Sequence, residues 1–268
     1  MPKELNEKKK KIQARTKVPQ KQRKMLIFRI FALIVLVVAS DLISQLAIGY
    51  LLLWILGADT FSQPVWTAIY SALSYVSELL ILLLVSRIAF KKRGEKSFLK
   101  TDREEVGLKG LPTWTDIGLA PVGFVVYLIM AGLFLALFSI FPWFDANQAQ
   151  DVGFSLMSAG ADRILAFLTL VVVAPIMEEV IFRGWFYGKL RGNLAQEVSE
   201  KTSIVVSTLI VSLIFGILHF QWNVGVNVFA LSIVLCLLRE ITGTTYAGIL
   251  LHMIKNGVAF YLLFIAVL

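Results

Sequence analysis

Long apolar stretches separated by short polar loops run through most of the chain. Seven can be drawn, covering residues 26–56, 65–90, 117–142, 163–188, 203–222, 224–239 and 244–268. A helix needs about 20 residues to cross the roughly 30 Å hydrocarbon core of a bilayer. The pattern therefore predicts an all-α, polytopic transmembrane helical bundle with about seven spans, eight being the alternative.

The composition and the distribution of charge support a membrane protein. Hydrophobic residues make up 57% of the chain and charged residues 16%, whereas soluble domains carry about a quarter charged residues. The net charge of +8 resides in residues 1–24, which hold ten Lys and Arg against two Glu. A basic tail before a first span predicts contact with anionic lipid headgroups and not with nucleic acid.

The loops give an orientation. The loop 91–116 carries seven Lys and Arg, whereas residues 57–63 and 143–162 carry none. The positive-inside rule then places the N-terminus in the cytoplasm, and seven spans would place the C-terminus outside. We divide the chain into a basic cytoplasmic tail (1–25), N-terminal transmembrane helices (26–162) and a catalytic transmembrane core (163–268).

Ionisable residues cluster in the fourth apolar stretch. Ionisable side chains inside a span cost roughly 2.5–3.5 kcal/mol at its centre, so they usually face a partner or a cavity. Glu179 and Arg183, four residues apart, share a helix face and can form an ion pair. The alternative to a functional role for this pair is a structural one near the interface. Glu178 is turned about 100° away from that face, which leaves it available as an acid or a base.

The chain has two histidines, and both lie in apolar stretches. Each has a partner four residues away in the same helix. Phe215 could pack beneath the His219 ring, and Asn256 could orient or supplement His252. A single histidine in a helix is usually structural, but two on separate helices, beside a carboxylate pair on a third, indicate a polar pocket.

Such a pocket could hydrolyse a bond in two ways, and the residues leave both open. His219, His252 and Glu178 could ligate a divalent metal such as zinc, which would activate a bound water. Alternatively, Glu178 and His219 could activate the water directly while His252 and Asn256 stabilise the oxyanion. The chain has no His-Glu-x-x-His motif, and we expect no organic cofactor.

Two further carboxylates lie in the first two spans. Asp41 and Glu78 could belong to the pocket or form hydrogen bonds between helices. We favour the second interpretation.

The ordered set of motifs resembles the CAAX-protease and bacteriocin-processing (CPBP or Abi) family of intramembrane peptidases. The set comprises Glu178-Glu179-x-x-x-Arg183, Phe215-x-x-x-His219 and His252-x-x-x-Asn256, and the resemblance covers about residues 163–262. It implies an endopeptidase, of metallo or glutamate type, that acts on a membrane-associated protein or peptide.

The resemblance also implies roles for the residues. Glu178 and His219 would activate the water, His252 and Asn256 would complete the site, and Glu179, Arg183 and Phe215 would support it. Substrates of such a family include CAAX-type proteins, bacteriocin leaders and signalling-peptide precursors, and some members are linked to bacteriocin immunity. The chain is compact and resembles the bacterial members of the family, which implies a bacterial plasma membrane.

One feature fits this set of roles poorly. The predicted helix boundaries place Glu178 and His219 on the order of 15 Å apart in depth, at about 1.5 Å per residue. The alternatives to a peptidase are a proton- or cation-coupled transporter that uses the same ionisable cluster, and a non-catalytic bacteriocin-immunity protein. The sequence does not determine an oligomeric state.

Overall fold

The computed structural model describes residues 20–93, 98–99, 101–146, 148, 154 and 160–266. Within these residues there is no strand, and seven helices are long and apolar enough to span a membrane. They are Arg23–Leu56, Pro64–Ala89, Trp114–Phe138, Ala161–Leu194, Glu200–Ile217, Trp222–Thr242 and Tyr246–Phe264. The predicted all-α bundle of seven spans is therefore confirmed, whereas most of the basic tail 1–25 lies outside the described residues.

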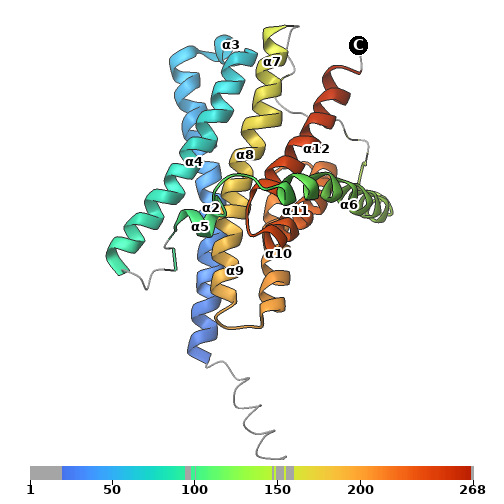
Figure 1. The fold of residues 1–268 in the computed structure, drawn as a ribbon. Helices are drawn as coiled ribbons and strands as arrows, with labels where there is room; N and C mark the ends of the chain where they lie inside the picture. Colours follow the sequence, from blue (N-terminus) through green and yellow to red (C-terminus); the bar gives the residue numbers. More distant parts are fainter. Residues whose placement is uncertain are drawn as a thin grey trace, which may run out of the picture.

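The first two spans form a hairpin, α2 (Gln20–Leu56) and α4 (Pro64–Arg93), joined by the short α3 (Ala58–Phe61). Gly57 ends α2 with φ +76°, a left-handed conformation that favours glycine. Pro64 is the first residue of α4, where a missing N–H costs no helical hydrogen bond. The hairpin forms one side of the molecule (Figure 1).

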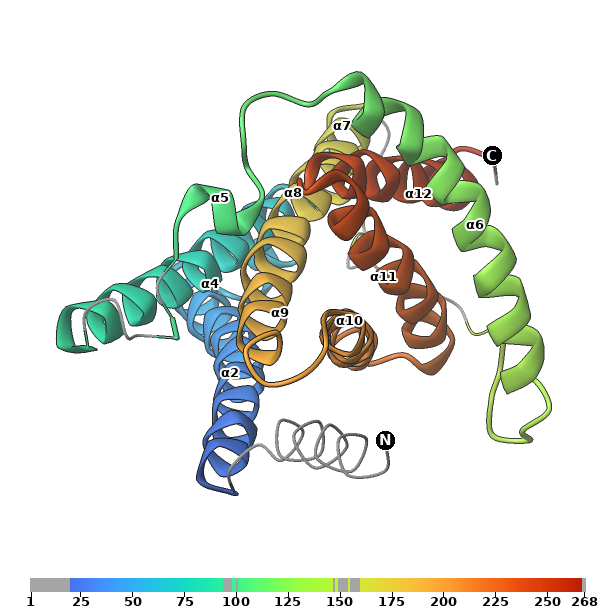
Figure 2. The same ribbon diagram turned by 60° about the horizontal axis from the view of Figure 1, so that its bottom comes forward.

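The fourth span is a single long helix made of five consecutive segments. These are α7 (Ala161–Phe167), η2 (Leu168–Val173), α8 (Ala174–Glu178), η3 (Glu179–Tyr187) and α9 (Gly188–Leu194), of which η2 and η3 are π-helical. We call it the central helix. It stands between the α2–α4 hairpin and the last three helices (Figure 2). Extended π-helical turns are rare and occur frequently at functional sites.

The last three spans complete the bundle: α10 (Glu200–Ile217), α11 (Trp222–Thr242) and α12 (Tyr246–Phe264). The third span, α6 (Trp114–Phe138), packs on the outer side of α11 and α12 (Figure 2). Asp116 fixes the start of α6, because it accepts hydrogen bonds from Thr113 in a capping box and from the Thr244 hydroxyl at the α11–α12 turn.

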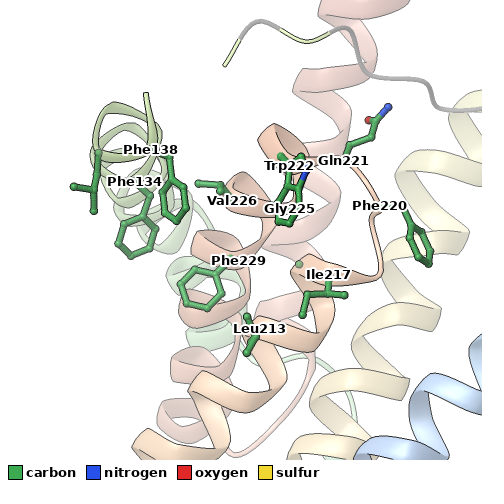
Figure 3. A pocket seen from close by; sticks show the side chains of 12 residues that line it. Phe134, Phe138, Leu213, Ile217, Phe220, Gln221, Trp222, Gly225, Val226 and Phe229 are labelled. Atoms are coloured by element: carbon green, nitrogen blue, oxygen red, sulfur yellow. The ribbon is translucent and has the colours of Figure 1, made fainter. Parts of the chain in front are cut away.

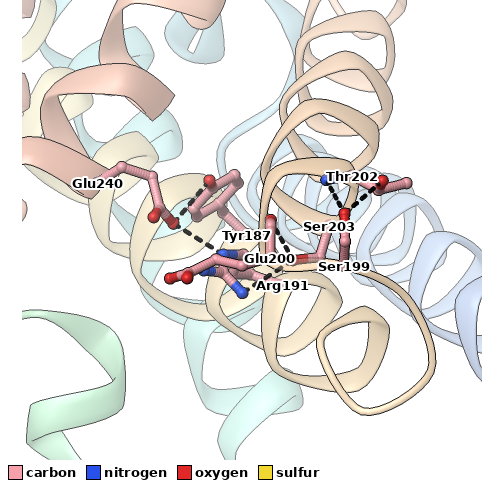
Figure 4. Close-up of polar contacts among 7 residues, drawn as sticks. All are labelled: Tyr187, Arg191, Ser199, Glu200, Thr202, Ser203 and Glu240. Atoms are coloured by element: carbon pink, nitrogen blue, oxygen red, sulfur yellow. Dashed lines mark hydrogen bonds and ion pairs between the residues drawn. The ribbon is translucent and has the colours of Figure 1, made fainter.

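Polar contacts fasten one end of the central helix to its neighbours (Figure 4). The Tyr187 hydroxyl donates to Glu240 Oε1 of α11 at 2.9 Å, and Arg191 pairs with the same oxygen at 3.2 Å. Arg191 also donates to the Ser203 hydroxyl of α10 at 2.9 Å. The short α5 (Arg103–Val106) lies at this end too, where Lys189 pairs with Glu105 at 2.6 Å.

Candidate active site

Glu178 ends α8, near the middle of the central helix, and two other helices supply its neighbours. The Tyr75 hydroxyl of α4 donates a hydrogen bond to Glu178 Oε1. On the other side, His252 Nε2 of α12 lies 3.7 Å from Glu178 Oε2. The carboxylate is thus held between α4 and α12, and its side chain keeps 14% of its surface exposed.

Glu179 belongs to a buried network with Arg183 and His252. Its Oε1 lies 2.9 Å from Arg183 Nη1 and 3.0 Å from His252 Nδ1, and the three side chains are 0%, 1% and 3% exposed. The predicted i, i+4 pair is therefore present, and both of its side chains are buried in the bundle. Gly248 of α12 leaves room for this network, since a methyl group there would lie 3.0 Å from Glu179 Oε2.

The network fixes the orientation of the His252 ring. Because a carboxylate only accepts, the contact with Glu179 places a proton on His252 Nδ1. Nε2 then faces Glu178 with either a lone pair or a second proton. The ring is thus held between the two adjacent carboxylates of the central helix.

His219 follows the end of α10, and its ring is also oriented. Nδ1 lies 2.8 Å from the Phe215 carbonyl oxygen, which only accepts, so Nδ1 donates and Nε2 is free to act as a base. The His219 and Phe215 rings pack with centroids 4.9 Å apart, as the sequence predicts. Phe215 in turn lies under the Arg183 guanidinium at 4.4 Å, which connects His219 to the buried network.

The environment of His219 favours its neutral form. Burial lowers the pKa of its imidazole, because desolvation penalises the charged ring, while the nearby Glu178 carboxylate partly opposes this effect. A neutral imidazole with a free Nε2 can accept a proton. His219 is thus suited to act as a base near neutral pH.

A cavity of about 240 Å³ brings the two candidate catalytic residues together. Its lining residues are Asp41, Gln45, Tyr70, Ser71, Ser74, Tyr75, Glu78, Glu178, Phe182, Phe215, Leu218 and His219. It lies between the α2–α4 hairpin on one side and the central helix and α10 on the other. The expected depth offset between Glu178 and His219 is therefore wrong.

The error came from the end of the fourth span. The central helix continues to Leu194, beyond the predicted end at residue 188, and α10 begins at Glu200. Counted from this turn at about 1.5 Å per residue, Glu178 lies about 24 Å and His219 about 29 Å along the helices. The two residues therefore sit at similar depths.

Asn256 contacts the central helix instead of His252. Its Nδ2 donates to the Leu170 carbonyl oxygen at 2.8 Å. In the π-helical register of η2, Ala174 N–H bonds the Thr169 carbonyl, so the donor for Leu170 would be residue 175. That residue is Pro175, which has no N–H. Asn256 thus satisfies a carbonyl that proline leaves without its helical donor.

The preferred interpretation of Asp41 and Glu78 needs correction. Both carboxylates line the cavity beside Glu178, and the hydrogen bond described for Asp41 comes from Gln45 of the same helix at 2.9 Å. Sequence reasoning also missed Tyr75. The signal was a polar stripe at helical spacing on α4, formed by Ser71, Ser74, Tyr75 and Glu78.

The arrangement described here does not fit the expected metal site. A catalytic zinc ion usually needs three protein ligands that converge on one point. Glu178, His219 and His252 are not grouped in this way, and no three His, Cys, Asp or Glu side chains among the described residues are. We therefore derive no step through a metal.

A second, larger cavity lies outside this site. It has a volume of about 590 Å³ and is formed by α6, α10 and α11 (Figure 3). Its lining is apolar and aromatic, including Phe134, Phe138 and Phe229, and none of its lining residues is ionisable. It offers no group for acid–base chemistry.

Fold and site together define a polytopic membrane protein with a carboxylate–imidazole centre inside its helical bundle. Residues 160–258, which contain every motif residue named above, match the family model described as type II CAAX prenyl endopeptidase Rce1-like. The predicted resemblance to the CPBP family is thereby confirmed.

One curated protein is also similar to this chain in sequence. The protein named "Putative membrane peptidase YdiL" from Bacillus subtilis (strain 168) is 24% identical over 195 residues, which cover 70% of this chain and 68% of that protein. No solved structure matches the chain. The family model and this relative together support an intramembrane peptidase.

Proposed function

We propose that this protein is an intramembrane endopeptidase of glutamate type, which hydrolyses a peptide bond in a membrane-associated protein or peptide. The observation that carries the proposal is the shared cavity of Glu178 and His219, where a carboxylate and a free imidazole nitrogen face the same space. General acid–base catalysis needs such groups within reach of one water molecule.

In the proposed reaction, Glu178 and His219 orient a water molecule toward the scissile carbonyl carbon. Glu178 takes a proton from the water while the water oxygen bonds to that carbon, and negative charge develops on the carbonyl oxygen. The same proton then passes to the amide nitrogen, the C–N bond breaks, and Glu178 returns to its carboxylate form.

The neighbouring residues support these steps in different ways. The Tyr75 hydroxyl holds Glu178, and a proton on His252 Nε2 would place positive charge beside the developing oxyanion. Glu179 and Arg183 keep the His252 ring oriented. Asn256 acts as a positioning residue through its hydrogen bond to Leu170 of η2, the segment that precedes α8 and Glu178.

The candidate substrates are CAAX-type proteins, bacteriocin leaders and signalling-peptide precursors. We place the protein in a bacterial plasma membrane with a cytoplasmic N-terminus, where the basic tail 1–25 contacts anionic headgroups. The bacterial origin of the peptidase-like relative supports this location.

The test is cleavage of candidate peptides by the purified protein in liposomes, with products read by mass spectrometry. Glu178→Gln and His219→Ala should each lower the rate by about 10²- to 10⁴-fold, the usual contribution of a general acid or base. Glu104→Gln is the matched control, because Glu104 is an exposed carboxylate that pairs with Lys109 at 3.2 Å.

Three outcomes would overturn the proposal or its mechanism. Full activity in either site variant would reject the site, and ion flux without cleavage would favour a transporter. Activity that a chelator abolishes and zinc restores would replace the glutamate mechanism with a metal-dependent one.

A further inference from the structure

The acidic residues of the α2–α4 hairpin are not used by the proposed reaction. Asp41 of α2 and Glu78 of α4 line the same cavity as Glu178, and we call these two residues the acidic wall. The carboxylates of Asp41, Glu78 and Glu178 lie close enough to interact electrostatically with one another. The cavity thus concentrates three acidic groups in an apolar bundle.

Glu78 is buried, and one of its carboxylate oxygens has no partner among the described residues. Its side chain is 2% exposed, and no group in the described part of the chain forms a hydrogen bond with its Oε1. Asp41 Oδ2 also has no hydrogen-bond partner among the described residues, because the Gln45 amide donates to the other oxygen, Oδ1. Buried polar groups in proteins nearly always have partners, so these two oxygens are acceptors in need of a donor.

The residues described as lining the cavity include no cationic side chain. Two cations lie nearby: Arg183 is bound to Glu179, and Lys255 of α12 interacts with Glu178 and does not line the cavity. An ionisable residue inside a span is costly unless it meets a partner or a ligand. A ligand that brings a positive charge would offset this cost.

The geometry favours an organic cation over a metal ion. A metal ion needs several ligands within about 2.0–2.6 Å of one point, and the described residues offer no such group of three. An ammonium or guanidinium group carries three or five N–H donors that can reach separate acceptors at ordinary hydrogen-bond distances. Asp41 Oδ2 and Glu78 Oε1 provide such acceptors.

We propose that the acidic wall of Asp41 and Glu78 binds a lysine or arginine side chain of the substrate, next to the scissile bond. This role of the acidic wall rests on the proposed function. Glu178 and His219 line the same cavity, so a side chain held by the acidic wall lies beside the groups that activate the water. The enzyme therefore prefers a basic residue at this position.

Binding is tested first, because it does not depend on cleavage. Hexylamine, protonated at neutral pH, mimics a lysine side chain, and hexanol is its neutral counterpart. Hexylamine should raise the unfolding temperature of the purified full chain more than hexanol does. Glu78→Gln and Asp41→Asn should each remove this difference, whereas Glu104→Gln should retain it.

Three binding results would overturn the proposal. One is equal stabilisation by hexylamine and hexanol, and another is stabilisation by hexylamine that persists in both acidic-wall variants. The third is Glu78-dependent stabilisation by calcium, magnesium or sodium but not by hexylamine, which would assign the wall to an inorganic cation. None of these results depends on whether the protein is a peptidase.

Cleavage gives the second readout. Matched peptides carry lysine or the uncharged norleucine directly before or after the scissile bond. The wild type should show a kcat/KM for lysine about 10- to 100-fold above that for norleucine, the range expected for one charge-assisted hydrogen bond. In Glu78→Gln this ratio should fall toward one, and an unchanged ratio would reject the assignment.

Discussion

Two groups of ionisable residues on opposite sides of Glu178 differ in how their charges are paired. On one side, Glu179 is held by Arg183 and His252, which we call the paired network, and all three side chains are buried. On the other side, the acidic wall of Asp41 and Glu78 keeps oxygens without a described partner. Buried charges are stable only when paired. The paired network is therefore complete without a ligand, whereas the acidic wall is the place where we propose that a substrate side chain binds.

The largest effect is expected where the paired network is broken. Arg183→Met leaves the buried Glu179 carboxylate with His252 alone, and it should lower the free energy of unfolding by about 3–5 kcal/mol. Glu78→Gln removes an unpaired carboxylate and should change stability little or raise it. Denaturant titration in micelles measures both, and similar losses in the two variants would erase the contrast between the two sides.

The next effect concerns the hydrogen bond that crosses the cavity. Tyr75→Phe removes the donor to Glu178 and should lower kcat/KM by about 10- to 100-fold, because hydrogen bonds to charged groups contribute about 1.5–3 kcal/mol. Tyr50→Phe, at a residue that is 70% exposed, is the control. Equal rates for the wild type and Tyr75→Phe would show that Glu178 needs no support from α4.

A smaller effect is expected at the hydrogen bond from Asn256 to the Leu170 carbonyl of η2. Asn256→Ala should cost about 1–3 kcal/mol of stability, because it leaves the Leu170 carbonyl without a donor. In a Pro175→Ala background the backbone regains an N–H, so the same substitution should cost less. A double-mutant cycle measures this coupling, and strictly additive losses would contradict the assigned role of Asn256.

The smallest effect is a shift in titration. The pKa of His219 is lowered by burial, so its ring should charge only below its ordinary value of about 6.5. Activity that requires a neutral His219 should then persist as the pH falls through 6.5 and decline only below it. The chain has two histidines, so histidine-labelled protein gives two imidazole signals, and His219→Gln assigns them. A His219 midpoint above 6.5 would contradict this environment.

The parts of the site that depend on one helix were predictable. The Glu179–Arg183 ion pair and the Phe215–His219 ring contact both follow from the i, i+4 geometry of a helix, whatever surrounds it. The contacts between helices were not predictable. The hydrogen bond from Tyr75 to Glu178 joins residues 103 positions apart in the sequence, and the one between His252 and Glu179 joins residues 73 positions apart.

The depth of the residues shows the same limit. An error of six residues at the end of the fourth span, between residue 188 and Leu194, moved Glu178 by about 9 Å relative to its neighbours. Hydropathy indicates which residues lie in the membrane. It does not mark where a helix ends when that end is buried and partly polar, as the end of the central helix is. Asp41 and Glu78 were misjudged for a related reason, since hydropathy does not reveal which helix faces which.

The sequence by itself determined the membrane bundle, the candidate residues on three helices and the resemblance to a peptidase family. Apolar length and helical period are local properties, and they survive any arrangement of the helices. The tertiary structure decided that Glu178 and His219 share a cavity, that Asn256 compensates for Pro175, and that Asp41 and Glu78 line the same cavity. These features depend on how side chains pack between helices distant in sequence, which no local pattern records.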